Sequence, residues 1–257
     1  MSVSLRAILL IACFGCAVSL GQEKSPESGK MMMDAMAAKK KLMAPEVMEK
    51  AKKEMTGEKS IVPAMVAKEM MIQGMMKDTE FMGMVKKGAM APMPQDEMMS
   101  VDKMKMAGDK MINEPSQMQL LFQELIARHI AAKKMSMMAK SDDGKKKAAQ
   151  GKPMMMDEKM MMDAKKDIKG NDANMMMARE VLIHSLMLDK EVMAVVEKEA
   201  MMQEDPKMAP MMSDNKMMMA GEEMMKSKEK TKEMMQEAMM RQMTDGKKGM
   251  MKDGAKK

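Results

Sequence analysis

The stretch Met175–Met201, MMMAREVLIHSLMLDKEVMAVVEKEAM, decides the fold because it has the pattern of two consecutive helices. Its first part, Met176–Leu188, contains no proline and carries apolar residues around most of a helical circumference. Asp189 stands where an N-cap residue would begin a second helix, and Glu191 falls in the first turn of that helix. The second helix has an apolar stripe with i, i+3, i+4, i+8 spacing, formed by Val192, Val195, Val196 and Ala200. Because no segment alternates with a two-residue period over a useful length, we predict an all-α fold.

The same pattern occurs earlier in the chain. A shift of 111 residues aligns Val66–Met90 with Met177–Met201 without a gap, and a shift of 113 residues aligns Met98–Gly144 with Met211–Lys257. The aligned positions share Asp, Ile, Ser, Gly, Gln and Arg residues, which an abundance of Met and Lys does not explain. We therefore predict a tandem duplication of a helical hairpin unit. The two hairpins would pack loosely as a four-helix bundle, with extra helices and mobile Met/Lys-rich segments around it.

The beginning of the chain predicts export. Residues 1–21 have the pattern of a signal peptide, in which Arg6 precedes the apolar run AILLIACFGCAVSL and small residues precede a cleavage point before Gln22. We therefore expect a periplasmic or extracellular protein. Lipoprotein anchoring is the less favoured alternative, because cleavage at Cys13 would leave a very short signal and the residues before Cys16 fit poorly. Since both cysteines lie in this segment, the mature chain would have no thiol and no disulfide.

Composition divides the rest of the chain into helical units and linkers. Segments rich in Lys, Gly, Asp and Met, with few branched or aromatic residues, are expected to be mobile or loosely helical. The predicted order is a linker at 22–44, a first unit at 45–144, a linker at 145–171, and a second unit at 172–257 with a frayed C-terminal tail. Asp78 and Asp189 occupy the same place in the two units and mark the turn of each hairpin. The last long helix, KTKEMMQEAMMRQMTDGKKGMMK, is more polar than its counterpart and is expected to pack less firmly.

The chain contains 54 methionines among 257 residues, and the aligned copies show what many of them do. At several positions one copy has Met where the other has Leu, Val, Ile or Phe, so these positions require an apolar side chain and not a sulfur ligand. Met is a good helix former, and its flexible side chain fills irregular gaps. In the alignment of the two copies, four methionines of the first copy match branched residues of the second. Met70, Met71, Met75 and Met84 match Val181, Leu182, Leu186 and Val195. In the other direction, Leu121, Phe122, Ile126 and Ile130 face Met234, Met235, Met239 and Met243.

A second group keeps methionine in both copies and is the candidate metal site. Its members are Met98, Met99, Met104, Met106 and Met111, which face Met211, Met212, Met217, Met219 and Met224. The thioether is a soft, neutral ligand that suits Cu(I), and Ag(I) is a further candidate. Met-x-Met spacing lets two sulfurs converge in an extended or loosely turned segment, whereas a regular helix puts them on different faces. The cluster resembles the Met-x-Met runs of exported copper-handling proteins over a short stretch, which implies soft-metal binding or buffering. In a chain this rich in Met, retained pairs are also expected from composition alone.

Two other functions are consistent with the sequence. Exposed thioethers are oxidised to sulfoxides and restored by reductases, so an exported Met-rich chain could scavenge oxidants in the cell envelope. The runs that suit this role are Met31–Met33, Met154–Met156 and Met160–Met162. Alternatively, the protein is structural and has no ligand, and it contacts itself or an envelope protein through flexible Met-rich faces.

The sequence argues against an enzyme and against a nucleic-acid binder. The mature chain has no Cys nucleophile, no G-x-S-x-G, no H-E-x-x-H and no Gly-rich phosphate loop after a strand. It also lacks Trp and Tyr, so stacking platforms for single strands are absent. Glu180 and His184 are four residues apart and could share a metal, but a solvated polar stripe is the simpler interpretation. We predict no certain cofactor and no transmembrane span in the mature chain.

Overall fold

Every regular element that the computed structural model describes is a helix, which confirms the predicted all-α class. The described residues are 35–57, 61–90, 101–140, 157–203 and 213–253. In the first part of the chain the labelled helices are α3 (Pro45–Thr56), α4 (Val62–Lys77), α5 (Thr79–Met90), α7 (Val101–Asn113) and α8 (Pro115–Lys140). In the second part they are α10 (Glu158–Asp167), α11 (Asn171–Met187), α12 (Lys190–Gln203), α13 (Asp214–Lys226) and α14 (Lys228–Asp253). Within the described ranges, none of these helices combines the length and the apolar character that a membrane crossing requires.

The two predicted hairpin turns are confirmed. The chain turns at Asp78 between α4 and α5, and at Leu188–Asp189 between α11 and α12. Each aspartate begins the second helix, because its Oδ1 accepts hydrogen bonds from two backbone N–H groups of the first turn. The N–O distances are 2.9 and 3.0 Å at Asp78, and 2.9 and 3.3 Å at Asp189. The apolar side chains of the hairpins are largely covered. The buried ones are Met75, Phe81, Val85, Leu182, Leu186, Val192 and Val196, and the half-buried ones are Met70, Met71, Met84, Val181 and Val195.

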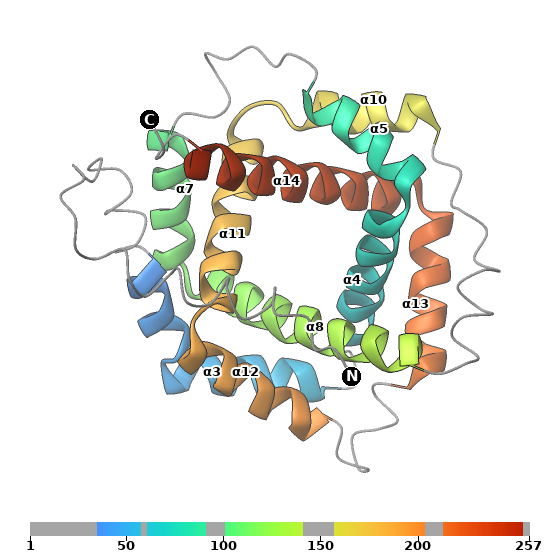
Figure 1. The fold of residues 1–257 in the computed structure, drawn as a ribbon. Coiled ribbons are helices and arrows are strands. Elements are labelled where there is room, and N and C mark those ends of the chain that lie inside the picture. The colour runs from blue at the N-terminus through green and yellow to red at the C-terminus, as the bar shows by residue number, and fades with distance from the viewer. Residues whose placement is uncertain (1–34, 58–60, 91–100, 141–156, 204–212, 254–257) are drawn as a thin grey trace, which may run out of the picture. The chain divides into compact units, whose positions relative to one another are not determined.

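The bundle is not built from the two hairpins alone. Its central helices are α4, α8, α11 and α14, and each of them contacts the next in that cyclic order (Figure 1). The second helices of the hairpins lie against long helices instead, with α5 on α14 and α12 on α8. One reason is helix length, because α8 and α14 have 26 residues each and can contact several other helices along their length. Helical bundle packing is therefore found, with a different set of central helices from the predicted one.

The two parts of the chain interlock. We call the part from α3 to α8 the N-terminal half and the part from α10 to α14 the C-terminal half. Helix α7 of the N-terminal half packs against α11, and the corresponding helix α13 of the C-terminal half packs against α4. The contact of α5 with α14 has the same counterpart in the contact of α12 with α8. Each half thus completes the core of the other. The common origin of the two halves by tandem duplication stays a prediction.

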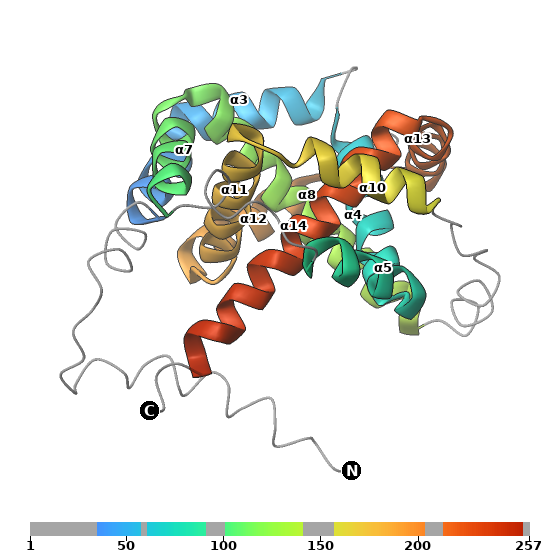
Figure 2. The ribbon, with the colours of Figure 1, turned by 90° about the horizontal axis from the view of Figure 1, so that it is seen from above.

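Part of each predicted linker is helical and belongs to the core. Residues 35–42 form a helix, and residues 157–168 contain α10, which packs against α5 and α14 (Figure 2). The expectation of loose structure is wrong for these residues. Composition misled the prediction because small and flexible apolar side chains, with little branched content, still fill the available space. The side chains concerned are Ala38, Leu42, Met161, Ala164 and Ile168, each no more than 6% exposed.

The last helix is also packed more firmly than its polar sequence predicted. In α14 the positions that match branched and aromatic residues of α8 are occupied by methionines, and three of these four side chains are completely buried, namely Met234, Met235 and Met239. The residues of α8 that align with these methionine positions, Leu121, Phe122, Ile126 and Ile130, are buried as well. The structure therefore supports the interpretation that these positions require an apolar side chain, for which Met is sufficient.

Candidate functional site

Six of the ten methionines predicted to form a metal site lie in described helices. Those in α7 are Met104, Met106 and Met111, and those in α13 are Met217, Met219 and Met224. The other four, Met98, Met99, Met211 and Met212, lie outside the described residues. The geometry of the predicted cluster can therefore be followed on two regular helices.

Helical geometry separates the neighbouring methionines. Met104 is 5% exposed and Met106 is 72% exposed, while Met217 is 6% exposed and Met219 is 70% exposed. This follows from the helix itself, in which residues two positions apart point in directions about 200° apart. The sulfurs of the described Met-x-Met pairs therefore do not converge on one ion. Met111 and Met224, which occupy aligned positions of α7 and α13, are 2% and 6% exposed and also belong to the core.

The exposed methionines form a second population with a different explanation. Of the 15 large hydrophobic side chains that are exposed among the described residues, 12 are methionines. An exposed position needs no apolar side chain for packing, so the substitution of Met for Leu or Ile that accounts for the core does not account for these. The exposed methionines are Met36, Met90, Met106, Met137, Met138, Met162, Met187, Met201, Met202, Met218, Met219 and Met225.

Buried charges meet between the four central helices. This central ion network consists of Glu69 on α4, Glu124 and Arg128 on α8, Glu180 on α11, and Glu237 and Arg241 on α14, each between 3 and 7% exposed. On α8 and on α14 the spacing is Glu-x-x-x-Arg, which puts both side chains on one face of the helix. Arg128 Nη2 lies 2.6 Å from Glu124 Oε1, and Arg241 Nη2 lies 2.5 Å from Glu237 Oε1.

The two arginines of the network also connect the halves of the chain. Arg241 holds Glu69 with two bonds, of 2.9 Å from Nη1 to Oε1 and 2.5 Å from Nη2 to Oε2. Arg128 holds Glu180 in the same manner, at 2.5 Å from Nη2 to Oε1 and 3.3 Å from Nη1 to Oε2. Two-bond contacts of this kind fix orientation as well as charge. The network therefore sets the register of α8 against α11 and of α14 against α4.

Two half-exposed cations complete the charge balance. Lys68 Nζ lies 2.7 Å from Glu237 Oε2, and Arg179 forms an ion pair with Glu124 Oε2. Their side chains are 31% and 37% exposed, and both line a cavity of about 310 Å³ beside the network. Four carboxylates are thus matched by four cations. This arrangement meets the condition under which buried charges are tolerated, namely that each has a partner.

Electrostatics hold the network in its charged form. Burial alone would raise the pKa of Glu69, but the hydrogen bonds and charge of Arg241, together with the charge of Arg128, hold it below its usual value. Burial also opposes ionisation of Glu237, yet Lys68 and the arginines lower its pKa to about 2. For Arg241, burial opposes the charge and the bonds to Glu69 outweigh it, so its pKa is raised. The ion pairs therefore persist at neutral pH.

The carboxylates of the network could be considered as metal ligands. Glu124, Glu180 and Glu237 each offer one oxygen, and these oxygens lie within 4.8 Å of one another. The guanidinium of Arg128 stands among the same groups, with its Nη2 2.6 Å from Glu124, 2.5 Å from Glu180 and 3.5 Å from Glu237. Because Arg128 supplies the cation that these carboxylates require, the cluster fits an ion-pair network and not a metal centre.

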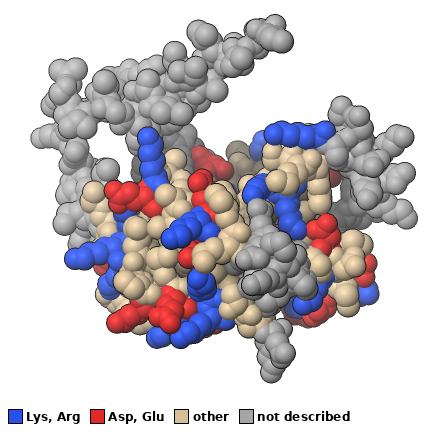
Figure 3. Space-filling model, turned by 90° about the horizontal axis from the view of Figure 1, so that it is seen from below, with Lys and Arg blue, Asp and Glu red and all other residues tan. Residues whose placement is uncertain are grey.

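The histidine considered as a metal ligand lies at the edge of this network. His184 Nε2 is 3.9 Å from Glu180 Oε2 and 3.9 Å from Asp245 Oδ1. Both oxygens of Glu180 already accept hydrogen bonds from the guanidinium of Arg128, so this carboxylate is satisfied by a cation of the protein and does not need a metal. On the molecular surface, Figure 3 shows acidic and basic side chains interspersed over one face. The described geometry thus leaves the exposed methionines as the group with unassigned chemistry.

Sequence reasoning did not assign the central ion network, although a signal was present. In the aligned copies Glu69 matches Glu180, and the spacing Glu-x-x-x-Arg at 124–128 recurs at 237–241. On a single helix such a spacing is most simply a solvated pair, because oppositely charged residues four apart stabilise exposed helices. Only the packing of four helices shows that these charges are buried.

The chain was also compared with other proteins. It matches none of the known protein families, the curated proteins or the solved structures with which it was compared.

Proposed function

We propose that this protein is an exported oxidant scavenger, in which the exposed methionines are oxidised to sulfoxides and then restored by reductases. The observation that carries the proposal is that 12 of the 15 exposed large hydrophobic residues among the described ones are methionines. Thioethers at a surface are accessible to peroxide and hypochlorous acid, and their sulfoxides are substrates of reductases. The predicted signal peptide would bring the chain to a compartment where such oxidants arrive from outside.

The framework of the protein suits repeated oxidation. A sulfoxide is polar and disrupts a packed core, but on a surface the added oxygen faces water. The core methionines of α7 and α13, Met104 and Met217, are nearly inaccessible, whereas Met106 and Met219 of the same helices point outward. The halves of the chain are joined by the central ion network, which contains no sulfur. Oxidation of the exposed methionines should therefore leave the fold intact.

The proposal is tested by residue-resolved oxidation. The full-length protein is treated with limiting hydrogen peroxide, digested and analysed by mass spectrometry, and a second sample is afterwards incubated with both epimer-specific methionine sulfoxide reductases. We expect Met106 and Met219 to be oxidised well before Met104 and Met217, and to be restored by the reductases. Circular dichroism should show unchanged helicity through one cycle. Equal reactivity of all four residues, or sulfoxides that the reductases do not repair, would contradict the proposal.

The two helices provide a matched pair of control variants. In M106L/M219L the exposed sulfurs are removed, and in M104L/M217L an equal number of buried sulfurs is removed at neighbouring positions. Leu and Met have similar volumes, so both variants should fold. We expect the first variant to lose two equivalents of rapid peroxide consumption and the second to lose none.

Buffering of Cu(I) or Ag(I) is the second proposed function. It is favoured by the exposed methionines of the described helices, which place soft ligands at the surface. A titration with Cu(I) in the presence of a competing chelator tests it, with M106L/M219L and a variant that also replaces Met98, Met99, Met211 and Met212 by Leu. Failure to take up copper against a micromolar competitor would reject this function. A protein that neither binds copper nor undergoes the oxidation cycle would be left with the structural role, as a partner of itself or of an envelope protein.

A further inference from the structure

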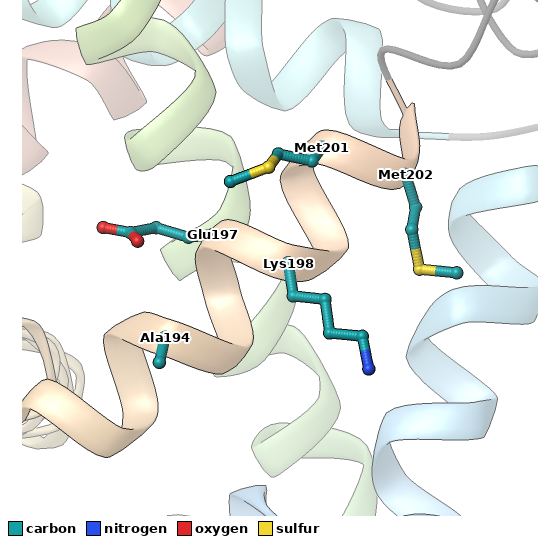
Figure 4. A pocket seen from close by; sticks show the side chains of 5 residues that line it. All are labelled: Ala194, Glu197, Lys198, Met201 and Met202. Atoms are coloured by element: carbon teal, nitrogen blue, oxygen red, sulfur yellow. The ribbon is translucent and has the colours of Figure 1, made fainter.

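One exposed methionine lies in an open cavity next to positive charge. The cavity, of about 410 Å³, is lined on α12 by Ala194, Glu197, Lys198, Met201 and Met202. Figure 4 shows that Met202 and Lys198 extend to one side of α12, while Met201 and Glu197 extend to the other. The sulfur of Met202 also accepts a hydrogen bond from Lys52 of α3, with a distance of 3.8 Å from Nζ to Sδ.

The two methionines of this cavity therefore differ in charge environment more than in access. Met201 is 60% exposed and Met202 is 41% exposed, so an oxidant of the size of hydrogen peroxide can reach both. Met202 has an ammonium group against its sulfur and a second lysine one helical turn before it, whereas Met201 has a carboxylate at the equivalent place. A cation beside the sulfur matters because negative charge develops on the departing oxygen when a peroxide is attacked.

We propose that Met202 is a preferred site of hydrogen peroxide reduction, and that Lys52 assists the reaction by stabilising the departing oxygen. This inference rests on the oxidant-scavenging function proposed above. The sulfur lone pair attacks one oxygen of hydrogen peroxide, and the O–O bond breaks as the S–O bond forms. The departing oxygen takes the proton from the oxygen now bound to sulfur, which gives water and the sulfoxide. Sulfur loses two electrons and the peroxide gains them, while the Lys52 ammonium donates a hydrogen bond to the departing oxygen.

The structure contains a comparison that separates the lysine contact from access. Met217 accepts the same kind of hydrogen bond, from Lys134, with the same 3.8 Å distance from Nζ to Sδ. However, Met217 is only 6% exposed, and Lys134 also bonds to Asp214 at 2.9 Å. Among the described residues, Met201 thus has access and no lysine at its sulfur, Met217 has the lysine without access, and Met202 has both. Of these three methionines, Met202 is expected to react fastest.

The test measures the rate of sulfoxide formation at each of these methionines in the full-length protein. Wild type, K52Q, K52R and the control K134Q are exposed to excess hydrogen peroxide, and digests are quantified by mass spectrometry over time. In the wild type we expect Met202 to react about fivefold faster than Met201, the factor that corresponds to one additional hydrogen bond in the transition state. K52Q should remove this advantage, K52R should retain most of it, and K134Q should leave it unchanged.

The direction of the K52Q effect distinguishes chemistry from simple shielding. Lys52 is exposed, so its replacement should leave the fold unchanged, which circular dichroism verifies. If Lys52 only shielded the sulfur from peroxide, Met202 would be oxidised faster in K52Q than in the wild type. The inference is overturned if Met202 reacts no faster than Met201, or if K52Q does not slow it. Either result would leave the broader scavenging function standing as long as Met106 and the other exposed methionines still react before the buried ones.

Discussion

Removal of Arg241 should be one of the most destabilising single substitutions in this protein. Arg241 is 6% exposed, bonds to Glu69 through two nitrogens, and bonds to Glu237 at 2.5 Å. In R241M the side-chain volume is largely kept, but Glu69 would retain only its hydrogen bond from Gln73 and a more distant Arg128. Breaking a buried ion pair by removing one partner costs about 3–5 kcal/mol. For a unit of this size we therefore expect the melting temperature to fall by about 10 °C.

The assay is urea unfolding followed by circular dichroism, with a second variant that tests the cause. In E69M/R241M no carboxylate is left without its arginine in this pair, so the double variant should recover about half of the lost free energy of unfolding. The matched control is K53M, which removes an exposed ion pair with Glu49 and should change stability by less than about 0.5 kcal/mol. A loss below about 1 kcal/mol in R241M, or no recovery in the double variant, would refute the reasoning.

Three further outcomes follow from the same structure. The pKa of Glu237 is lowered from 4.5 to about 2 in the fold, so its contribution to stability is complete above about pH 5 and is lost as the pH falls towards 2. The free energy of unfolding from urea titrations should therefore be nearly equal at pH 7 and 5, and lower by about 2 kcal/mol from this residue at pH 3. D78A and D189A each remove an N-cap and should each lower the free energy of unfolding by about 1 kcal/mol, measured in the same urea assay. G74A should stabilise the protein by up to about 1 kcal/mol in thermal melts, because Gly74 lies inside α4 and an added Cβ would meet no atom within 4 Å.

The parts of the fold that depend on local sequence were predictable. The helical class and both hairpin turns follow from periodicity and from two aspartates whose side chains cap the next helix. Which helices pack against each other was not predictable. Helix α8 buries residues around its whole circumference, so its sequence does not indicate which helix covers which side. The sequence did not predict α10 for a related reason. The segment around Met161 and Ala164 has a low-complexity composition, and these side chains are buried because α10 packs against α14.

The candidate site shows the same division between local and tertiary information. That Met104 and Met106 would diverge follows from helical geometry once the segment is known to be a regular helix, and the sequence left an extended conformation open. Which methionine faces solvent then depends on α11, the helix against which α7 packs. The buried character of Glu124 and Arg128 likewise depends on helices far away in the sequence.

Burial should divide the methionines into a reactive and a protected population. The most direct measurement compares the rates of sulfoxide formation at Met104 and Met106 in the native protein and in the protein unfolded by urea. These two residues share one helix and one peptide environment, but their exposed fractions are 5% and 72%. We expect Met106 to react much faster than Met104 in the native state, and we expect this difference to disappear on unfolding. Equal rates in the native state, or a difference that persists in urea, would contradict it.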